Sequence, residues 1–423
     1  MGRKVFLSFL GTNPYIPCNY DGVENCEFVQ EALIKKHCLS WDENDKIIIF
    51  LTKDAEIKNW KDEGNFEKGL ERKLNSLNIK PEIIPVFNVF EGKSEKEIWQ
   101  IFDIVFEKII ENDELYYDVT HSFRSLPMLG MTLLNYAKFL KNIKVSAIYY
   151  GALEALGSIP EVKQMPIEQR NVPVFDLTSF SALQDWSVAA DNFINYGNSE
   201  KIKNLIKENI EPILKETKGK DAFAQNLKKF SESIETVTKV FSTCRGNHIK
   251  DGTVFETLKS RILAIKSESI NALLPLLEKI EEKVNDYEKN DVLNGFKAVK
   301  WCIDHNLIQQ GITMLQETII TYVLTELREN TNVAEKREVV SSAFYLKSFN
   351  FPEEKWNKNC QDNKALVKKV FKFDEIGKIY DSLRDFRNNI NHGGFCDDWN
   401  SDQFSKKLKS SYEELMKIIN NHA

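Results

Sequence analysis

The sequence has no apolar run long enough to cross a membrane. Its longest obvious run, Ile47–Leu51, is far shorter than the roughly 20 residues that a membrane-spanning helix needs. The apolar part of the N-terminal segment MGRKVFLSFLGTN is also too short for a signal peptide, and it leads straight into a polar turn. We therefore expect a cytoplasmic protein with no membrane partner.

The sequence also lacks paired cysteines and an excess of positive charge. Its seven cysteines are scattered and never form C-x-x-C, which predicts reduced thiols rather than a disulfide framework or a zinc site. The net charge of −6 argues against constitutive duplex-DNA binding, so any anion site must be a local concentration of donors. There is no fixed-period repeat, which argues against a solenoid.

The length of 423 residues, 42% of them hydrophobic, suits two domains with separate cores. In residues 1–178, short β-rich runs alternate with segments of helical period. Strands are expected at Lys4–Leu10, Lys46–Thr52, Glu82–Val86, Glu114–Thr120 and Val145–Gly151, with Pro173–Leu177 as a candidate edge strand; helices are expected around Val23–His37, Asn65–Leu77, Glu95–Ile110 and Met128–Leu140. This order predicts a Rossmann-like, doubly wound α/β domain with a parallel sheet covered on both faces.

Residues 179–423 have helical period throughout, which predicts an all-α domain. Apolar residues recur at i, i+3, i+4 and i+7 in NLIKENIEPILKE, ETLKSRILAIKS, NALLPLLEKIEEKV, LIQQGITMLQETIITYVLTEL and SSYEELMKIINN. The helices between about Phe180 and Leu307 carry no motif that we can assign to catalysis or docking.

Two strand ends in the α/β domain have unusual sequences. The first is LGTNPY, in which Gly11 permits a tight turn and Thr12 and Asn13 add short hydrogen-bonding side chains. It is no G-x-G-x-x-G, so a nicotinamide-cofactor site loses its main support. Because ligands of doubly wound sheets bind outside the carboxyl ends of strands, this turn is a candidate binding loop.

The second strand end is YYDVTHSFRSLPML, residues 116–129. Thr120, His121, Ser122, Arg124 and Ser125 place five hydrogen-bonding side chains in six positions, before a helix that begins near Leu126-Pro127. This composition suits a phosphate or nucleobase pocket. The alternative is that Thr120, Ser122 and Ser125 are turn and cap residues and that Arg124 forms a surface ion pair.

Near the C-terminus the chain reads DFRNNINHGG. Five positions advance an α-helix by about 140°, so Arg387 and His392 would not share one face of a regular helix. His392 must therefore lie where the helix ends, and Gly393-Gly394 supply that ending. The alternative is a C-capping histidine, with Arg387 paired to Asp381 or Asp385.

Chemically, such a pair suits RNA cleavage by the substrate's own 2′-hydroxyl. A histidine of near-neutral pKa can move the proton, and an arginine can stabilise the charge on the phosphorane oxygens. No metal is required, and the sequence offers no carboxylate cluster or histidine-rich site to hold one. Two copies facing each other across a dimer axis would supply acid, base and charge stabilisation together.

Taken together, LGTNPY, DVTHSFRSLP and RNNINH, in this order and domain setting, resemble the CRISPR-associated CARF–HEPN ribonucleases, accessory effectors of type III CRISPR systems. In that family a Rossmann-like CARF sensor precedes an α-helical HEPN nuclease domain. The resemblance covers nearly the whole length, and RNNINH has the R-N-x-x-x-H form of the family's nuclease motif.

The resemblance implies a role for each matching residue. Arg387 and His392 would be catalytic, with Asn388 orienting the backbone or the scissile phosphate. Cyclic oligoadenylate, the allosteric activator, would bind at Gly11, Thr12, Asn13, Thr120, His121, Ser122, Phe123, Arg124 and Ser125. A homodimer, or a higher oligomer, would cleave single-stranded RNA and leave 2′,3′-cyclic phosphate and 5′-hydroxyl ends. No other cofactor is implied.

Other functions stay open at this point. The sensor could itself cleave cyclic oligoadenylate, as a ring nuclease, with Thr12, Ser122 and Arg124 positioning a ribose hydroxyl for in-line attack. The helical domain could instead recruit a partner without breaking any bond. The ring size is also open: we expect cyclic tetra-adenylate as the more frequent case in the family, with cyclic hexa-adenylate as the alternative.

Overall fold

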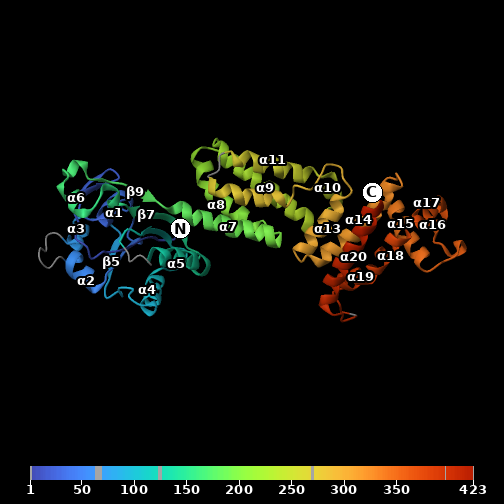
Figure 1. Ribbon diagram of the computed structural model, residues 1–423, viewed down its shortest axis with the longest axis horizontal. Helices are drawn as coiled ribbons and strands as arrows, with labels where there is room; N and C mark the ends of the chain where they lie inside the picture. The colour runs from blue at the N-terminus through green and yellow to red at the C-terminus, as the bar shows by residue number, and fades with distance from the viewer. Residues whose placement is uncertain (1, 62–68, 122–125, 268–270, 396, 423) are drawn as a thin grey trace. The chain divides into compact units, whose positions relative to one another are not determined.

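The computed structural model describes all of residues 1–423 except 1, 62–68, 122–125, 268–270, 396 and 423. The chain forms two compact units, Met1–Gln184 and Asp185–Ala423. The division falls inside helix α7 (Thr178–Tyr196), and the boundary expected after residue 178 falls near the start of the same helix. Each unit is described separately below (Figure 1).

The first unit is built on a six-stranded sheet in the order β5-β4-β1-β6-β7-β9. Its strands are β1 (Lys4–Phe9), β4 (Lys46–Phe50), β5 (Glu82–Val86), β6 (Glu114–Asp118), β7 (Lys144–Gly151) and β9 (Val174–Asp176). The first five are parallel to their neighbours, whereas β9 pairs antiparallel with β7 at the edge. The predicted α/β fold and the edge strand are thus confirmed.

Helices cover both faces of this sheet. On one face, α1 (Val29–His37) and α3 (Leu70–Ser76) pack on Ile47 and Ile49 of β4. On the other, α4 (Glu95–Lys108) and α5 (Leu126–Lys141) pack on Ile48 and Phe50 of the same strand. Successive side chains of a strand point to opposite faces, so the continuous apolar run of β4 supplies two cores at once.

One predicted helix begins later than expected. Residues Val23–Cys26, assigned above to a helix, form β3, which pairs with β2 (Cys18–Tyr20) as a hairpin. Asp21 and Gly22 have positive φ, and an Asp-Gly pair between two strands favours this two-residue turn. β8 (Asn171–Val172) completes a small three-stranded sheet beside the main one.

The remaining elements of this unit are short. They are α2 (Lys53–Ala55), a π-helical turn (Glu56–Trp60), α6 (Ile159–Gln164) and 3₁₀ turns at Leu153–Leu156 and Ile167–Gln169. The π-helical turn follows β4 and brings the buried Asn59 toward the end of β1.

The second unit is helical, as predicted. Its helices after α7 are α8 (Glu200–Glu216), α9 (Ala222–Ser242), α10 (Gly246–Asp251), α11 (Thr253–Lys266), α12 (Leu274–Glu282), α13 (Asn294–Asp304), α14 (Ile308–Glu326), α15 (Ala334–Ser348), α16 (Lys358–Asp362), α17 (Lys364–Val370), α18 (Asp374–Ser382), α19 (Arg384–Asn391) and α20 (Ser401–His422). All five segments singled out by their period are helical, and they share one hydrophobic core.

The apolar helix α14 lies at the centre of this unit. It packs against α13, α15, α19 and α20, and most of its residues are buried. Polar side chains on α14 therefore lie among buried neighbours and need partners. None of the helices in the described ranges combines the length and apolar composition needed to cross a bilayer.

Candidate functional site

The two unusual strand ends meet at the point where the strand order of the sheet reverses. From β1 the chain proceeds to β4 and β5 on one side, then returns to β6 and β7 on the other. β1 and β6 are neighbours, with Ser8 opposite Asp118, so the loops that leave them lie side by side. In open α/β sheets such a switch point is where ligands bind.

Asn59 holds the loop after β1 in place. Its side-chain amide donates to the carbonyl oxygens of Gly11 (2.7 Å) and Asn13 (3.0 Å). The Gly11 amide donates to the Tyr15 hydroxyl at 2.9 Å. Gly11 has no left-handed φ; instead, a Cβ there would lie 3.1 Å from the Tyr15 oxygen and 3.3 Å from His121, so a larger residue would have to displace these neighbours by a few tenths of an ångström.

The buried Asp118 holds the start of the loop after β6. Its carboxylate accepts from the Ser8 hydroxyl at 2.7 Å and from the Thr120 amide at 3.0 Å. Burial raises the pKa of Asp118 above its usual range, and these hydrogen bonds oppose the rise. The Thr120 hydroxyl accepts from the Gly151 amide at 2.8 Å, which ties this loop to the end of β7.

A pocket of about 320 Å³ opens at these loops, a size typical of small-molecule sites. It is lined by Asn13, Pro14, Tyr15, Ile16, Tyr20, Thr120, His121, Tyr150, Gly151, Leu153, Glu154, Gly157, Ser158 and Ile159. Three residues predicted from the sequence, Asn13, Thr120 and His121, are thus brought together. Burial lowers the pKa of His121 to about 4, so its ring is neutral at pH 7.

Other predicted residues of this site are placed differently. Gly11 and Thr12 belong to the same loop but are not among the residues that line the pocket. Ser122, Phe123, Arg124 and Ser125 lie outside the described residues, so their roles stay predictions. Asn59, Tyr15 and Tyr150 were not predicted from the sequence, and only Tyr15, the last residue of LGTNPY, belongs to a recognised motif.

The candidate nuclease motif in the second unit lies on α19. The helix ends at Asn391, His392 is its C-cap, and Gly393 and Gly394 follow with φ of 70° and 68°. The left-handed glycines end the helix as predicted. His392 and Asn388 are exposed, and the His392 amide donates to the Asn388 carbonyl at 3.0 Å.

Two asparagines of the motif have structural partners. Asn389 donates to the carbonyl of Asp397 at 2.8 Å, which holds the chain after the glycines. Asn391 accepts from Gln309 of α14 at 3.3 Å. These contacts hold the end of α19, whereas Asn388 is exposed and is not part of them.

Arg387 is held by α14. Its guanidinium donates to Gln316 Oε1 through Nη1 at 3.4 Å, and its Nη2 lies 3.4 Å from Glu317 Oε1. Gln316 is buried, and its amide donates to the Tyr380 carbonyl at 3.1 Å. The alternative in which Arg387 pairs with Asp381 or Asp385 is therefore wrong: Arg387 pairs with Glu317, and Asp381 pairs with Arg384 at 2.5 Å.

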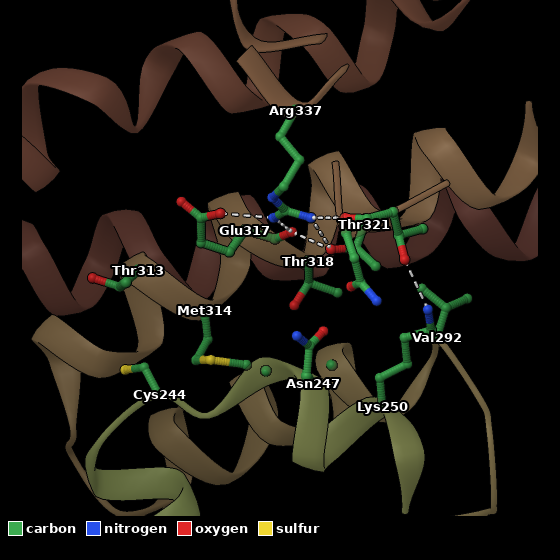
Figure 2. A pocket seen from close by; sticks show the side chains of 14 residues that line it. Cys244, Asn247, Lys250, Val292, Thr313, Met314, Glu317, Thr318, Thr321 and Arg337 are labelled. Atoms are coloured by element: carbon green, nitrogen blue, oxygen red, sulfur yellow. Dashed lines mark hydrogen bonds and ion pairs between the residues drawn. The ribbon is translucent and has the colours of Figure 1, made fainter. Parts of the chain in front are cut away.

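Glu317 is itself fixed by a second arginine. Its other oxygen, Oε2, lies 2.7 Å from Arg337 Nη2, and Arg337 also donates to Thr321 Oγ1 at 2.9 Å. Figure 2 shows this guanidinium between Glu317 and Thr321, at a polar pocket of about 300 Å³. Because both terminal nitrogens of Arg337 are bonded within the fold, this arginine holds one oxygen of Glu317 while the other lies toward Arg387.

The sequence reasoning missed Gln316, Glu317 and Arg337. The available signal was Gln316, a polar residue in the buried part of α14, because buried polar groups need hydrogen-bond partners. Within the part of the chain that the structure describes, no group of three His, Cys, Asp or Glu side chains is placed to hold a metal ion.

Comparison with known proteins gives three similarities. Residues 5–154 match the family model of the CARF domain of the CRISPR system endoribonuclease Csx1. Residues 182–291 match that of the second domain of CRISPR-associated protein MJ1674. The MJ1674 protein of Methanocaldococcus jannaschii is 27% identical over 341 residues, which make up 78% of this chain and 45% of the relative. This chain therefore matches less than half of that relative's length.

These similarities support a CRISPR-associated protein with an N-terminal CARF domain and a following helical region. The helices that carried no recognisable motif, within residues 182–291, correspond to the second domain of MJ1674. Residues 387–392 lie beyond both matched ranges. A nuclease role for that segment therefore depends on its geometry and remains a proposal.

Proposed function

We propose that this protein is a single-stranded RNA endoribonuclease of type III CRISPR defence, activated by cyclic oligoadenylate. One observation carries the proposal: Arg387, held by Gln316 and Glu317, lies about 1.4 helical turns before the exposed His392 at the end of α19, where two glycines follow. The CARF similarity of residues 5–154 adds the sensor that such an enzyme requires.

In the proposed reaction the 2′-hydroxyl of the RNA attacks the adjacent phosphorus. A bond from the 2′-oxygen to phosphorus forms, and the bond to the 5′-oxygen breaks. One His392 accepts the 2′-hydroxyl proton, and a second His392 gives a proton to the leaving 5′-oxygen. Arg387 stabilises the negative charge of the phosphorane, and Asn388 orients the phosphate. The products carry 2′,3′-cyclic phosphate and 5′-hydroxyl ends.

Two histidines imply two chains. We propose a homodimer in which the motifs of both copies form one composite site about the two-fold axis. A cyclic oligoadenylate that lies on the same axis would contact both sensor pockets. It activates only if it binds the competent arrangement of the dimer more tightly than the inactive one.

The switch-point pocket is the proposed binding site for part of that ring. Asn13, Thr120 and the neutral ring of His121 offer hydrogen bonds to adenine and ribose, and Tyr15 and Tyr150 offer aromatic surface. Arg124, outside the described residues, is proposed to meet a phosphate. Cyclic tetra-adenylate is the proposed activator, with cyclic hexa-adenylate as the second choice.

The test is RNA degradation by the purified chain against a panel of cyclic oligoadenylates, with EDTA present. The proposal expects cleavage of single-stranded RNA that depends on one ring size, with 2′,3′-cyclic phosphate on the products. Lack of cleavage with every ring would contradict it. Loss of the ring itself, with RNA intact, would favour a ring nuclease, and ligand binding without either reaction would favour a non-catalytic binding module.

A further inference from the structure

The second unit contains another pocket, next to the start of α19. Its volume is about 410 Å³. It is lined by Ser341, Ser342, Tyr345, Leu346, Phe351, Lys355, Asn357 and Arg384. These residues come from α15, from the segment that follows it, and from the first position of the motif helix, so the pocket and the motif share an element.

Exposed aromatic rings line and flank this pocket. The ring of Tyr345 lies 4.7 Å from that of Phe349 and 5.8 Å from that of Phe351. Tyr345 is 39% exposed and Phe349 is 62% exposed, although most large apolar side chains of this unit are buried. Aromatic rings held at a surface offer flat faces on which a nucleobase can stack.

Cations accompany these rings. The Arg384 guanidinium lies 4.6 Å from the centre of the Tyr345 ring, and Asp381 holds it there. Lys355 lines the same pocket. Ser342 and Asn357, linked by a hydrogen bond of 3.2 Å, add polar groups to the wall. A stacked arginine, a lysine and aromatic rings together match the groups that bind single-stranded nucleic acid.

The pocket and the candidate nuclease motif lie along the same helix, because Arg384 lines the pocket and is the first residue of α19. Arg384 and Asn388 are four residues apart on α19, so they follow one another on the same face at a rise of about 6 Å. His392 follows after another four residues, about 12 Å from Arg384 along the axis. A strand of RNA that runs along this face would place one base at Tyr345 and a phosphate near Asn388 and His392.

We propose that this pocket, with Tyr345 as its platform, stacks an unpaired base of the single-stranded RNA next to the cleavage site. This inference rests on the proposed nuclease function and names the subsite that selects its substrate. Bases in a duplex are already stacked on one another and cannot enter, so the pocket excludes double-stranded RNA. It recognises the aromatic face of a base rather than a particular base edge, so sequence preference is weak.

The test measures RNA binding without cleavage. The full chain with His392→Ala binds a fluorescent single-stranded RNA of mixed sequence, with and without cyclic tetra-adenylate, and anisotropy gives the dissociation constant. In this background, Tyr345→Ala is expected to weaken binding roughly tenfold, whereas Tyr345→Trp keeps it. Tyr196→Ala removes an exposed tyrosine of α7 and serves as the matched control, with no change expected.

Three results would overturn the inference: unchanged affinity in Tyr345→Ala, equal losses in Tyr345→Ala and Tyr345→Trp, or a duplex RNA bound as tightly as the single strand. Thermal unfolding of each variant verifies its fold. The outcome is separable from the nuclease proposal. If the wild-type chain cleaves no RNA but Tyr345→Ala weakens RNA binding, the base-stacking proposal is supported and the nuclease proposal is contradicted. If the wild-type chain cleaves RNA but Tyr345→Ala binds RNA normally, the nuclease proposal is supported and the base-stacking proposal is contradicted.

Discussion

The Arg387 guanidinium and the Glu317 carboxylate face each other, with Nη2 and Oε1 3.4 Å apart, and join the motif helix α19 to the central helix α14. Arg337 holds the second carboxylate oxygen at 2.7 Å. Both side chains of the Arg387–Glu317 pair keep about a third of their surface exposed. A pair so exposed adds little to stability, so under the proposed function we expect it to position Arg387 rather than to stabilise the fold.

Glu317→Gln tests this positioning role. The amide keeps the shape of the side chain but loses the charge that orients Arg387, so we expect kcat for RNA cleavage to fall about 10- to 100-fold with little change in KM. The melting temperature should stay nearly constant. Glu326→Gln, an exposed position on the same helix, is the matched control. A fall in stability that parallels the fall in kcat would show a structural role instead.

Arg387→Lys tests whether the shape of the guanidinium matters as well as its charge. Arg387 uses two separate nitrogens, one toward Gln316 and one toward Glu317, and a lysine has only one. We expect ligand-stimulated cleavage to fall more than about 100-fold, while the affinity for cyclic oligoadenylate in calorimetry stays normal. Substantial activity in the lysine variant would mean that a positive charge alone suffices.

In the sensor, Asn59→Ala should weaken ligand binding without a contact to the ligand. The substitution leaves the carbonyls of Gly11 and Asn13 without the amide that holds their loop. We expect the dissociation constant for cyclic tetra-adenylate to rise roughly tenfold, measured by calorimetry. Asn75→Ala, on the exposed side of α3, is the control. Equal affinities for Asn59→Ala and wild type would remove this loop from the binding site.

The partly buried His121 makes the stability of the first unit depend on pH. Its pKa falls from 6.5 to about 4 on folding, so between these values the unfolded chain binds a proton that the folded chain does not. The free energy of unfolding is therefore not reduced by His121 above pH 6.5, and it decreases as the pH falls from 6.5 toward 4. His121→Gln should reduce this loss by roughly 3 kcal/mol, as measured by the free energy of unfolding across that pH window.

Asp118 does not obscure that measurement. Burial raises its pKa, so its contribution to stability has the opposite dependence on pH. It is present in both proteins, and it cancels in the difference between wild type and His121→Gln. Parallel pH curves for the two proteins would show that His121 titrates normally in the folded state.

Much of this architecture could be predicted from the sequence, because the spacing of apolar residues indicates which side of a helix or strand is buried. β4 is apolar along its whole length because both of its faces are covered, and the helical unit shows its buried stripes directly. The β2–β3 hairpin was missed because its strands are too short to show a period, although Asp21-Gly22 is a hairpin signal.

Only some residues of each candidate site could be predicted from the sequence, because the others are brought there by the fold. Arg387, His392 and Gly393-Gly394 are adjacent in sequence, so their spacing could be interpreted directly. Glu317 lies 70 residues from Arg387, and only the packing of α14 on α19 brings them together. Asn59 likewise reaches Gly11 across 48 residues. Contacts of this kind depend on the fold and leave no local pattern.

The most direct test of the account is the effect of His392→Ala on RNA cleavage stimulated by cyclic oligoadenylate. His248→Ala, an exposed histidine in the same unit, is the matched control. If the proposed function is correct, His392→Ala abolishes stimulated cleavage but binds the ligand normally, and His248→Ala behaves as wild type. Stimulated cleavage that persists in His392→Ala would contradict it.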